Sequence, residues 1–213
     1  MWPTGISYMV PGGYIDQERP LTPLILNNKF ISPLLHVFAG LCLWVMGWRT
    51  KGQVPNLKKF VLIAAPHSTN WDFVYFLLII FKLKMPVRWM GKDTMFISPF
   101  KRLLKGLGGI PVNRTVKGNL VRSMAEKFKG SDRMILTIAP SGTRQKVRQW
   151  KTGFYHIALQ AGIPVVLGFL DYKKKYGGIG PVFYPTGDLD KDLKSIQTFY
   201  KDKSGKYPEY GTA

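Results

Sequence analysis

A histidine and an aspartate five positions apart are the residues of this chain best suited to acid–base chemistry. His67 and Asp72 lie in APHSTNWDF, between an apolar run typical of a buried strand and a second one typical of a helix. α/β folds place reactive side chains after strand ends. A turn between the two residues brings the imidazole against the carboxylate, so that Asp72 fixes the tautomer and His67 takes a proton from a hydroxyl. The bare spacing also fits a purely structural pair, a helix-capping Asp beside a strand-end His.

Three glycine-containing blocks further along the chain are associated with predicted strands. GGIPVNR, at 108–114, has a glycine pair before a short strand that ends on Asn113 and Arg114. PSGTR, at 140–144, is a tight turn that brings Thr143 and Arg144 to the end of an apolar strand. AGIPVVLG, at 161–168, is a helix stop followed by a strand. Arginines at strand ends near a histidine suit a phosphate group, because the planar guanidinium binds oxyanions through two hydrogen bonds.

In order and content, these segments resemble the four motifs of the glycerolipid acyltransferases, the family typified by bacterial lysophosphatidic acid acyltransferase. HSTNWD matches the family's motif of His, four residues and Asp, and GGIPVNR, PSGTR and AGIPVV match the second, third and fourth motifs. The resemblance covers about residues 50–200. One such motif is weak evidence, whereas four in the family's order make the resemblance specific.

The resemblance implies a role for each matched residue. His67 would be the general base on the acceptor hydroxyl, Asp72 would orient it, and Pro164 with its neighbours would line the acyl-donor side. Arg114 would bind the phosphate of the acceptor. The substrate-binding set that the resemblance implies is Asn113, Arg114, Ser141, Gly142, Thr143 and Arg144. It implies neither a metal nor a bound cofactor, since acyl-coenzyme A or acyl-acyl carrier protein would be the donor substrate.

Ser141 departs from the family pattern, which usually has Glu at this position of the third motif. A hydroxyl makes hydrogen bonds, but it cannot hold a cation or a second acceptor hydroxyl as a carboxylate does. This departure leaves two alternative hypotheses beside the main one, an acyltransferase that acts on lysophosphatidic acid. One is a lipid-binding protein with the acyltransferase fold and weak or no catalysis, and the other is an acyltransferase for a different lyso-lipid acceptor.

The pattern of apolar runs predicts one α/β domain over residues 52–213, with a mixed, mostly parallel sheet flanked by helices. Strands are expected at 60–65, 87–90, 110–112, 134–138, 164–171 and 179–184. Helices are expected at 71–81, 99–107, 118–129 and 153–160, and from Asp188 or Asp190 to about residue 200. The apolar helix at 71–81 is interpreted as a core element, as a wall for an acyl chain, or as both.

Residues 1–51 are predicted to be an N-terminal arm followed by a hydrophobic helix at the membrane interface. The run at 30–48 has no charged residue and is flanked by basic residues. Crossing a bilayer needs about 20 strongly apolar residues, and Pro33 suits the first turn of a shorter helix of about 15 residues. Trp44 and Trp48 would lie at headgroup depth. A membrane span and a core helix remain alternatives. The run is not expected to be a signal peptide, because a long arm precedes it and no convincing small-residue cleavage pattern follows it.

The charge of the chain predicts an anionic partner. The net charge is +19, and residues 82–151 alone carry 17 basic and 3 acidic side chains. Lys101, Arg102 and Lys105, beside Phe100, suit lipid headgroups or an acidic acyl carrier protein. Nucleic acid is not the expected partner, because the chain has no recognisable nucleic-acid-binding motif. With 46% hydrophobic residues and a single cysteine, Cys42, the sequence excludes a disordered chain and an intramolecular disulfide.

Taken together, these observations predict a membrane-associated O-acyltransferase of phospholipid biosynthesis. It would move a fatty acyl group from a thioester to the free hydroxyl of a lysophospholipid, with lysophosphatidic acid as the expected acceptor. The expected partners are an anionic phospholipid membrane, the lysophospholipid and acyl carrier protein. The resemblance implies the cytoplasmic face of a bacterial inner membrane as its location. The acceptor headgroup, the preferred chain length, the donor type and the oligomeric state stay open.

Overall fold

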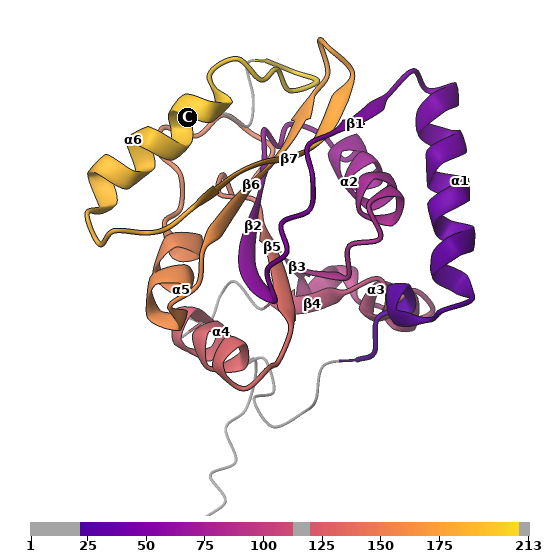
Figure 1. The fold of residues 1–213 in the computed structure, drawn as a ribbon, viewed down its shortest axis with the longest axis horizontal. Helices are drawn as coiled ribbons and strands as arrows, with labels where there is room; N and C mark the ends of the chain where they lie inside the picture. The colour runs from indigo at the N-terminus through magenta and orange to yellow at the C-terminus, as the bar shows by residue number, and fades with distance from the viewer. Residues whose placement is uncertain (1–21, 113–119, 209–213) are drawn as a thin grey trace, which may run out of the picture.

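Seven strands form one mixed sheet with helices on both faces (Figure 1). The computed structural model describes residues 22–112 and 120–208. The strands are β1 (Arg49–Lys51), β2 (Lys59–Ala65), β3 (Val87–Lys92), β4 (Gly109–Val112), β5 (Met134–Ile138), β6 (Val165–Asp171) and β7 (Tyr176–Phe183). The helices are α1 (Ile31–Val45), α2 (Trp71–Lys82), α3 (Lys101–Gly106), α4 (Leu120–Lys129), α5 (Gly153–Ala161) and α6 (Leu189–Tyr200), with short 3-10 turns η1 (Ile25–Asn27) and η2 (Asp93–Met95).

The strand order places several connecting loops at one edge of the sheet. The order is β1-β7-β6-β2-β5-β3-β4, and the five strands from β6 to β4 are parallel. β7 is antiparallel to β6 and parallel to β1. The loops after β2, β4 and β5 therefore leave the same edge, which is where open α/β sheets bind their ligands. The predicted fold class, a mixed and mostly parallel sheet flanked by helices, is confirmed.

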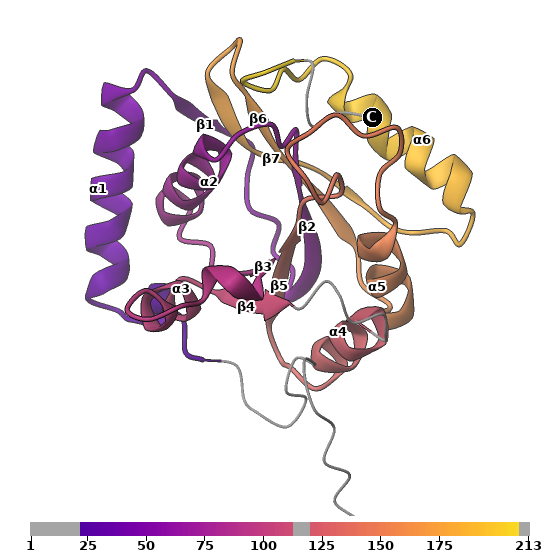
Figure 2. The ribbon, with the colours of Figure 1, turned by 180° about the vertical axis from the view of Figure 1, so that it is seen from behind.

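The central strands are buried on both faces, as their unbroken apolar runs predict. On one face, Val61 and Ile63 of β2 pack in a core that includes residues of α4, α5 and α6. On the other face, Phe60 and Leu62 pack in a core that includes residues of α1 and α2. Figure 2 shows these two groups of helices on opposite sides of the sheet. The β2 strand, which leads into His67, is thus held from both sides.

Most predicted elements are confirmed to within two or three residues at their ends. The helix α5 ends at Gly162, whose φ of 64° gives the left-handed cap that the sequence predicts. Asp188 caps α6 by accepting a hydrogen bond from the backbone N–H of Lys191, at 3.1 Å. The predicted start of the helix at 118–129 lies outside the described residues. The sequence did not predict β1, which joins residues 49–51 to the sheet through β7.

The helix α1 packs against α2 and leaves a broad apolar face exposed. Ala39 and Leu43 are buried toward the core. His36 donates from Nδ1 to the carbonyl oxygen of Lys82, the last residue of α2, at 2.7 Å. Apolar side chains of α1 that are more than half exposed are Leu34, Val37, Phe38, Leu41, Trp44 and Val45. Within residues 22–112 and 120–208, no helix combines the length and hydropathy that a bilayer crossing requires.

Candidate active site

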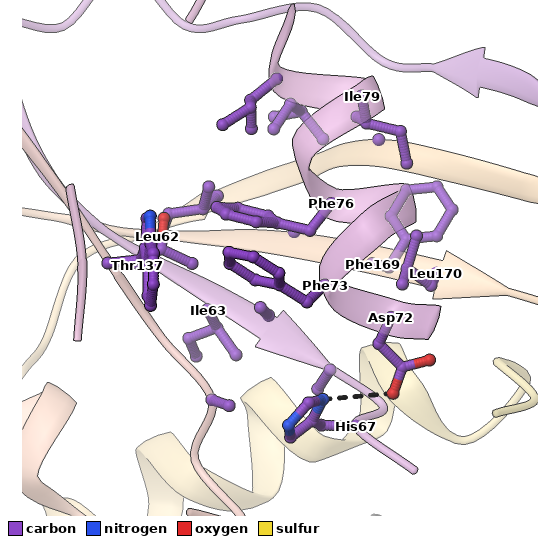
Figure 3. A pocket seen from close by; sticks show the side chains of 18 of the residues that line it. Leu62, Ile63, His67, Asp72, Phe73, Phe76, Ile79, Thr137, Phe169 and Leu170 are labelled. Atoms are coloured by element: carbon purple, nitrogen blue, oxygen red, sulfur yellow. Dashed lines mark hydrogen bonds and ion pairs between the residues drawn. The ribbon is translucent and has the colours of Figure 1, made fainter. Parts of the chain in front are cut away.

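The loop between β2 and α2 folds His67 onto Asp72. The Nδ1–H of His67 donates to Oδ2 of Asp72 at 3.1 Å (Figure 3). The same carboxylate oxygen accepts the backbone N–H of Ser68 at 2.6 Å and of Thr69 at 2.8 Å. The Asp72 side chain is 5% exposed and that of His67 is 28% exposed. The buried carboxylate is therefore fixed by its own loop, while the imidazole is accessible to a substrate.

The position of Asp72 at the start of α2 has two physical consequences. A carboxylate in the first turn interacts favourably with the positive end of the helix dipole. The backbone N–H groups that Asp72 accepts belong to Ser68 and Thr69 of the preceding loop, and the N-cap residue of α2 makes no side-chain cap hydrogen bond. In the tautomer with the proton on Nδ1, the Nε2 atom of His67 has a lone pair that can accept a proton. The described residues therefore show the predicted His67–Asp72 contact but no capping of α2 by the Asp72 side chain.

Tyr172 is a further hydrogen-bond partner of Asp72, and the sequence analysis did not predict it. Its hydroxyl donates to Oδ1 of Asp72 at 2.6 Å, across 100 residues of sequence. Burial, followed by the hydrogen bond to Asp72 and the charge of that carboxylate, raises the pKa of Tyr172 far above its ordinary value. The tyrosine therefore remains protonated and acts as a hydrogen-bond donor at any pH at which the protein works.

An aromatic cluster holds the ring of Tyr172. Trp48, which was expected at headgroup depth, is instead buried and stacks on Tyr75 of α2, with ring centroids 4.1 Å apart. The ring of Tyr172 packs edge-on against both, at centroid distances of 5.0 Å from Trp48 and 5.6 Å from Tyr75. Its backbone N–H donates to the carbonyl oxygen of Ser204 at 2.8 Å. Contacts other than the hydrogen bond to Asp72 therefore fix both the ring and the backbone of Tyr172.

An apolar cavity of about 140 Å³ lies beside this pair. His67 and Asp72 line one end, and Figure 3 shows Phe73, Phe76 and Ile79 following along α2 away from them. The opposite wall is the sheet, with lining residues from β2, β3, β5 and β6 that include Leu62, Trp89, Thr137, Gly168 and Phe169. The helix α2 therefore contributes side chains to the core and also to the wall of this cavity.

The PSGTR turn leaves β5 at the edge of the sheet where His67 lies. β5 pairs with β2, with Ile138 opposite Ile63, and Ala139 lines the cavity. Ser141 is buried, and its hydroxyl donates to the carbonyl oxygen of Thr143 at 2.7 Å. Gly142 has a φ of 63°, a conformation that favours glycine. The hydroxyl that replaces the expected Glu thus serves to close the turn.

The remaining predicted site residues lie at different places in the fold. Thr143 and Arg144 are exposed on the turn after β5. Asn113 and Arg114 lie outside the described residues, directly after β4, which ends at the same edge. Pro164 is buried at the amino-terminal end of β6, where its carbonyl oxygen accepts the N–H of Val61 at 3.0 Å. It does not line the cavity, whose β6 residues are Gly168, Phe169 and Leu170.

Within the described part of the chain, no three His, Cys, Asp or Glu side chains converge as a metal would require. The chemistry of the candidate site rests on the imidazole, the carboxylate and the neighbouring hydrogen-bond donors.

Fold and site together define an α/β protein with a His–Asp pair at the end of an apolar cavity. The chain belongs to the acyltransferase family, whose sequence model matches residues 48–166. This range includes the first three motif blocks and the start of the fourth, so the predicted family is confirmed.

A solved structure supports the fold, while no curated protein matches the sequence. The chain is similar to the crystal structure of the 1-acyl-sn-glycerophosphate (LPA) acyltransferase PlsC from Thermotoga maritima. The TM-score is 0.59 and the sequence identity 19%, and the match covers 81% of this chain and 78% of that one. At this identity the similarity establishes a shared fold.

Proposed function

We propose that this protein transfers a fatty acyl group from an acyl thioester to the free hydroxyl of a lysophospholipid. The observation that carries the proposal is the His67–Asp72 pair at the end of an apolar cavity, in a chain of the acyltransferase family. The donor is acyl carrier protein or coenzyme A thioester, and lysophosphatidic acid, which gives phosphatidic acid, is the proposed acceptor. The PlsC structure that shares this fold is described as an LPA acyltransferase.

The proposed reaction is a direct displacement at the thioester carbonyl. The Nε2 atom of His67 takes the proton of the acceptor hydroxyl as its oxygen attacks the carbonyl carbon. Asp72 stabilises the imidazolium through Nδ1–H and keeps the ring oriented. The tetrahedral oxyanion collapses, the carbon–sulfur bond breaks, and the imidazolium returns its proton to the thiolate. The apolar cavity binds the acyl chain, and Arg114 with Arg144 binds the phosphate of the acceptor.

Membrane association is part of the proposal, because donor chain and acceptor are both lipids. The exposed apolar face of α1 would enter the interfacial region, with Trp44 at headgroup depth. Ile97, Phe100 and Leu103 form a second exposed apolar surface at α3, beside basic residues. Ile25 of η1, the short turn that precedes α1, lies against Gly106 of α3. We propose the cytoplasmic face of a bacterial inner membrane as the location of this surface.

Acyl transfer measured with a His67→Ala variant tests the mechanism. The purified protein is incubated with anionic vesicles, a labelled acyl donor and lysophosphatidic acid, and the product is identified by mass. Loss of the general base should lower turnover by about 100-fold or more. His156→Ala is the matched control, because His156 lies on α5, on the face of the sheet opposite α2, and does not line the cavity.

Two outcomes would contradict the proposal. Turnover retained in His67→Ala would show that the imidazole is not the base. No transfer by the wild-type protein with either donor, to lysophosphatidic acid or to a lyso-aminolipid without phosphate, would favour a lipid-binding protein without catalysis.

A further inference from the structure

A second cavity, of about 530 Å³, lies at the edge of the sheet opposite to His67. Its walls include the segments that enter β2 and β5, and the loop that runs from α2 into β3. Parallel strands begin at this edge and end at the catalytic one, so the length of β2, about 20 Å, separates the two sites. We refer to this second cavity, lined by Lys58, Lys84, Arg88 and Arg133, as the basic cavity.

The basic cavity gathers positive charge without a compensating carboxylate. Its four cationic side chains come from three separate stretches of chain, because Lys84 and Arg88 lie four positions apart where the loop after α2 runs into β3, and none of its lining residues is Asp or Glu. Among the described residues, no ion pair involves any of the four. By contrast, Lys174, in the exposed turn at 173–175, pairs with Asp171 and Asp202. The basic cavity therefore places four cations around one concave site with no carboxylate among its lining residues.

Arg88 is the residue that most needs an anionic partner. It belongs to β3 and is half-buried, and burial lowers the pKa of its guanidinium. Removing a cation from water carries a cost that a nearby anion offsets. A guanidinium also offers paired N–H donors that match a phosphate group.

We propose that the basic cavity binds a small, soluble anion bearing at least two phosphate groups, such as inorganic pyrophosphate or a nucleoside diphosphate. Four cations arranged around one cavity suit several negative charges rather than one. The volume falls within the range of about 300–1,000 Å³ that is usual for small-molecule sites. The site is separate from the one proposed for the acceptor phosphate, because Arg114 follows β4 at the opposite edge of the sheet.

Calorimetric titration of the full-length protein with inorganic pyrophosphate tests the proposal. Orthophosphate and sulfate serve as weaker reference anions, and low ionic strength limits screening. Arg88→Met, which keeps much of the length of the side chain, should raise the Kd for pyrophosphate at least about tenfold. Arg133→Met should do the same from an exposed position at the start of β5, which keeps the test available if Arg88→Met does not fold.

Two control variants separate specific binding from the effects of net charge and of the acceptor site. Arg122→Met removes one positive charge from α4, where Arg122 pairs with the exposed Glu126, and should leave the Kd unchanged. Arg114→Ala should also leave it unchanged, even if the proposed acyltransferase activity is lost or absent. Equal effects of the Arg88, Arg133 and Arg122 variants would overturn the proposal, because they would show nonspecific attraction. Loss of binding in Arg114→Ala would also overturn it, by assigning the anion to the acceptor site.

An acidic macromolecule is the remaining alternative occupant of the basic cavity. If pyrophosphate does not bind, whereas acyl carrier protein binds and Arg88→Met abolishes that binding, the proposal of a small-anion site is wrong. Saturable binding of pyrophosphate that both arginine variants weaken supports it.

Discussion

Replacing Tyr172 by Phe removes one oxygen atom from the candidate site and keeps the aromatic ring. The lost group is the only hydrogen-bond donor that the described residues give to Oδ1 of Asp72. Asp72 is 4% exposed, so water cannot readily take its place. A hydrogen bond to a charged group contributes about 1.5–3 kcal/mol. We expect the free energy of unfolding to fall by about 2 kcal/mol, which for a protein of this size lowers Tm by about 4–8 °C.

The effect on catalysis should be smaller than the effect on stability. Three hydrogen bonds still hold Oδ2 of Asp72, so the carboxylate stays beside His67 but loses part of its orientation. If about 1 kcal/mol of the lost interaction raises the barrier, kcat falls about fivefold. KM should change little, because Tyr172 does not line the apolar cavity. The assay is steady-state acyl transfer, with Tm measured on the same samples.

Tyr75→Phe is the matched control for this substitution. Tyr75 belongs to the same aromatic cluster, but its hydroxyl has no hydrogen-bond partner among the described residues, so both kcat and Tm should stay close to the wild-type values. Tyr172→Phe should also have no further effect on kcat in an Asp72→Asn background, because its action passes through the carboxylate. If Tyr172→Phe behaves like Tyr75→Phe, or if its effect multiplies with that of Asp72→Asn, the hydroxyl does not position Asp72.

Two further predictions concern the membrane surface and alkaline pH. Trp44→Ser should weaken binding to anionic vesicles about tenfold or more, since burying a large apolar side chain contributes about 1.5–3 kcal/mol. Tyr184→Ser, which changes an exposed residue outside α1, should leave vesicle binding unchanged. Equal cosedimentation of the two variants with vesicles would argue against the proposed surface. Burial raises the pKa of Tyr155, Tyr172 and Tyr200, so above pH ~10 the unfolded chain loses protons that the native chain keeps. The free energy of unfolding should therefore decrease as pH rises. Tyr172→Phe should make the slope of this free energy against pH less steep by about 1.4 kcal/mol per pH unit, which urea titrations at several pH values can measure. An unchanged slope would show that Tyr172 ionises normally.

The parts of the fold that the sequence predicted are those with a strong local signal. β2 is an uninterrupted apolar run from Phe60 to Ala65, β5 is apolar except for Thr137, and Gly162 marks the end of α5. β1 was missed because its three residues, Arg-Thr-Lys, carry no strand pattern and are extended only through pairing with β7. The local contact between His67 and Asp72 was predicted for the same reason, since both residues lie in one short loop.

Tyr172 and the basic cavity could not be found in this way, because strand order creates both. Tyr172 directly follows β6, and His67 follows β2 by two residues; only the parallel pairing of these strands brings the two ends together. Its hydroxyl reaches Asp72 across 100 residues. The net charge of the middle segment predicted an anionic partner, but three separate stretches of chain have to meet before a cavity with that charge exists.

The helix α2 combines three requirements of the proposed reaction in one rigid element. Its first turn supplies Asp72 to the catalytic pair, and Phe73 and Phe76 on the next turns line the apolar cavity. Its last residue, Lys82, accepts a hydrogen bond from His36 of α1, the helix whose outer face is proposed to contact lipid. Close packing makes such a helix move as a unit. A displacement of α1 that shifts α2 should therefore alter the cavity and the orientation of Asp72 together.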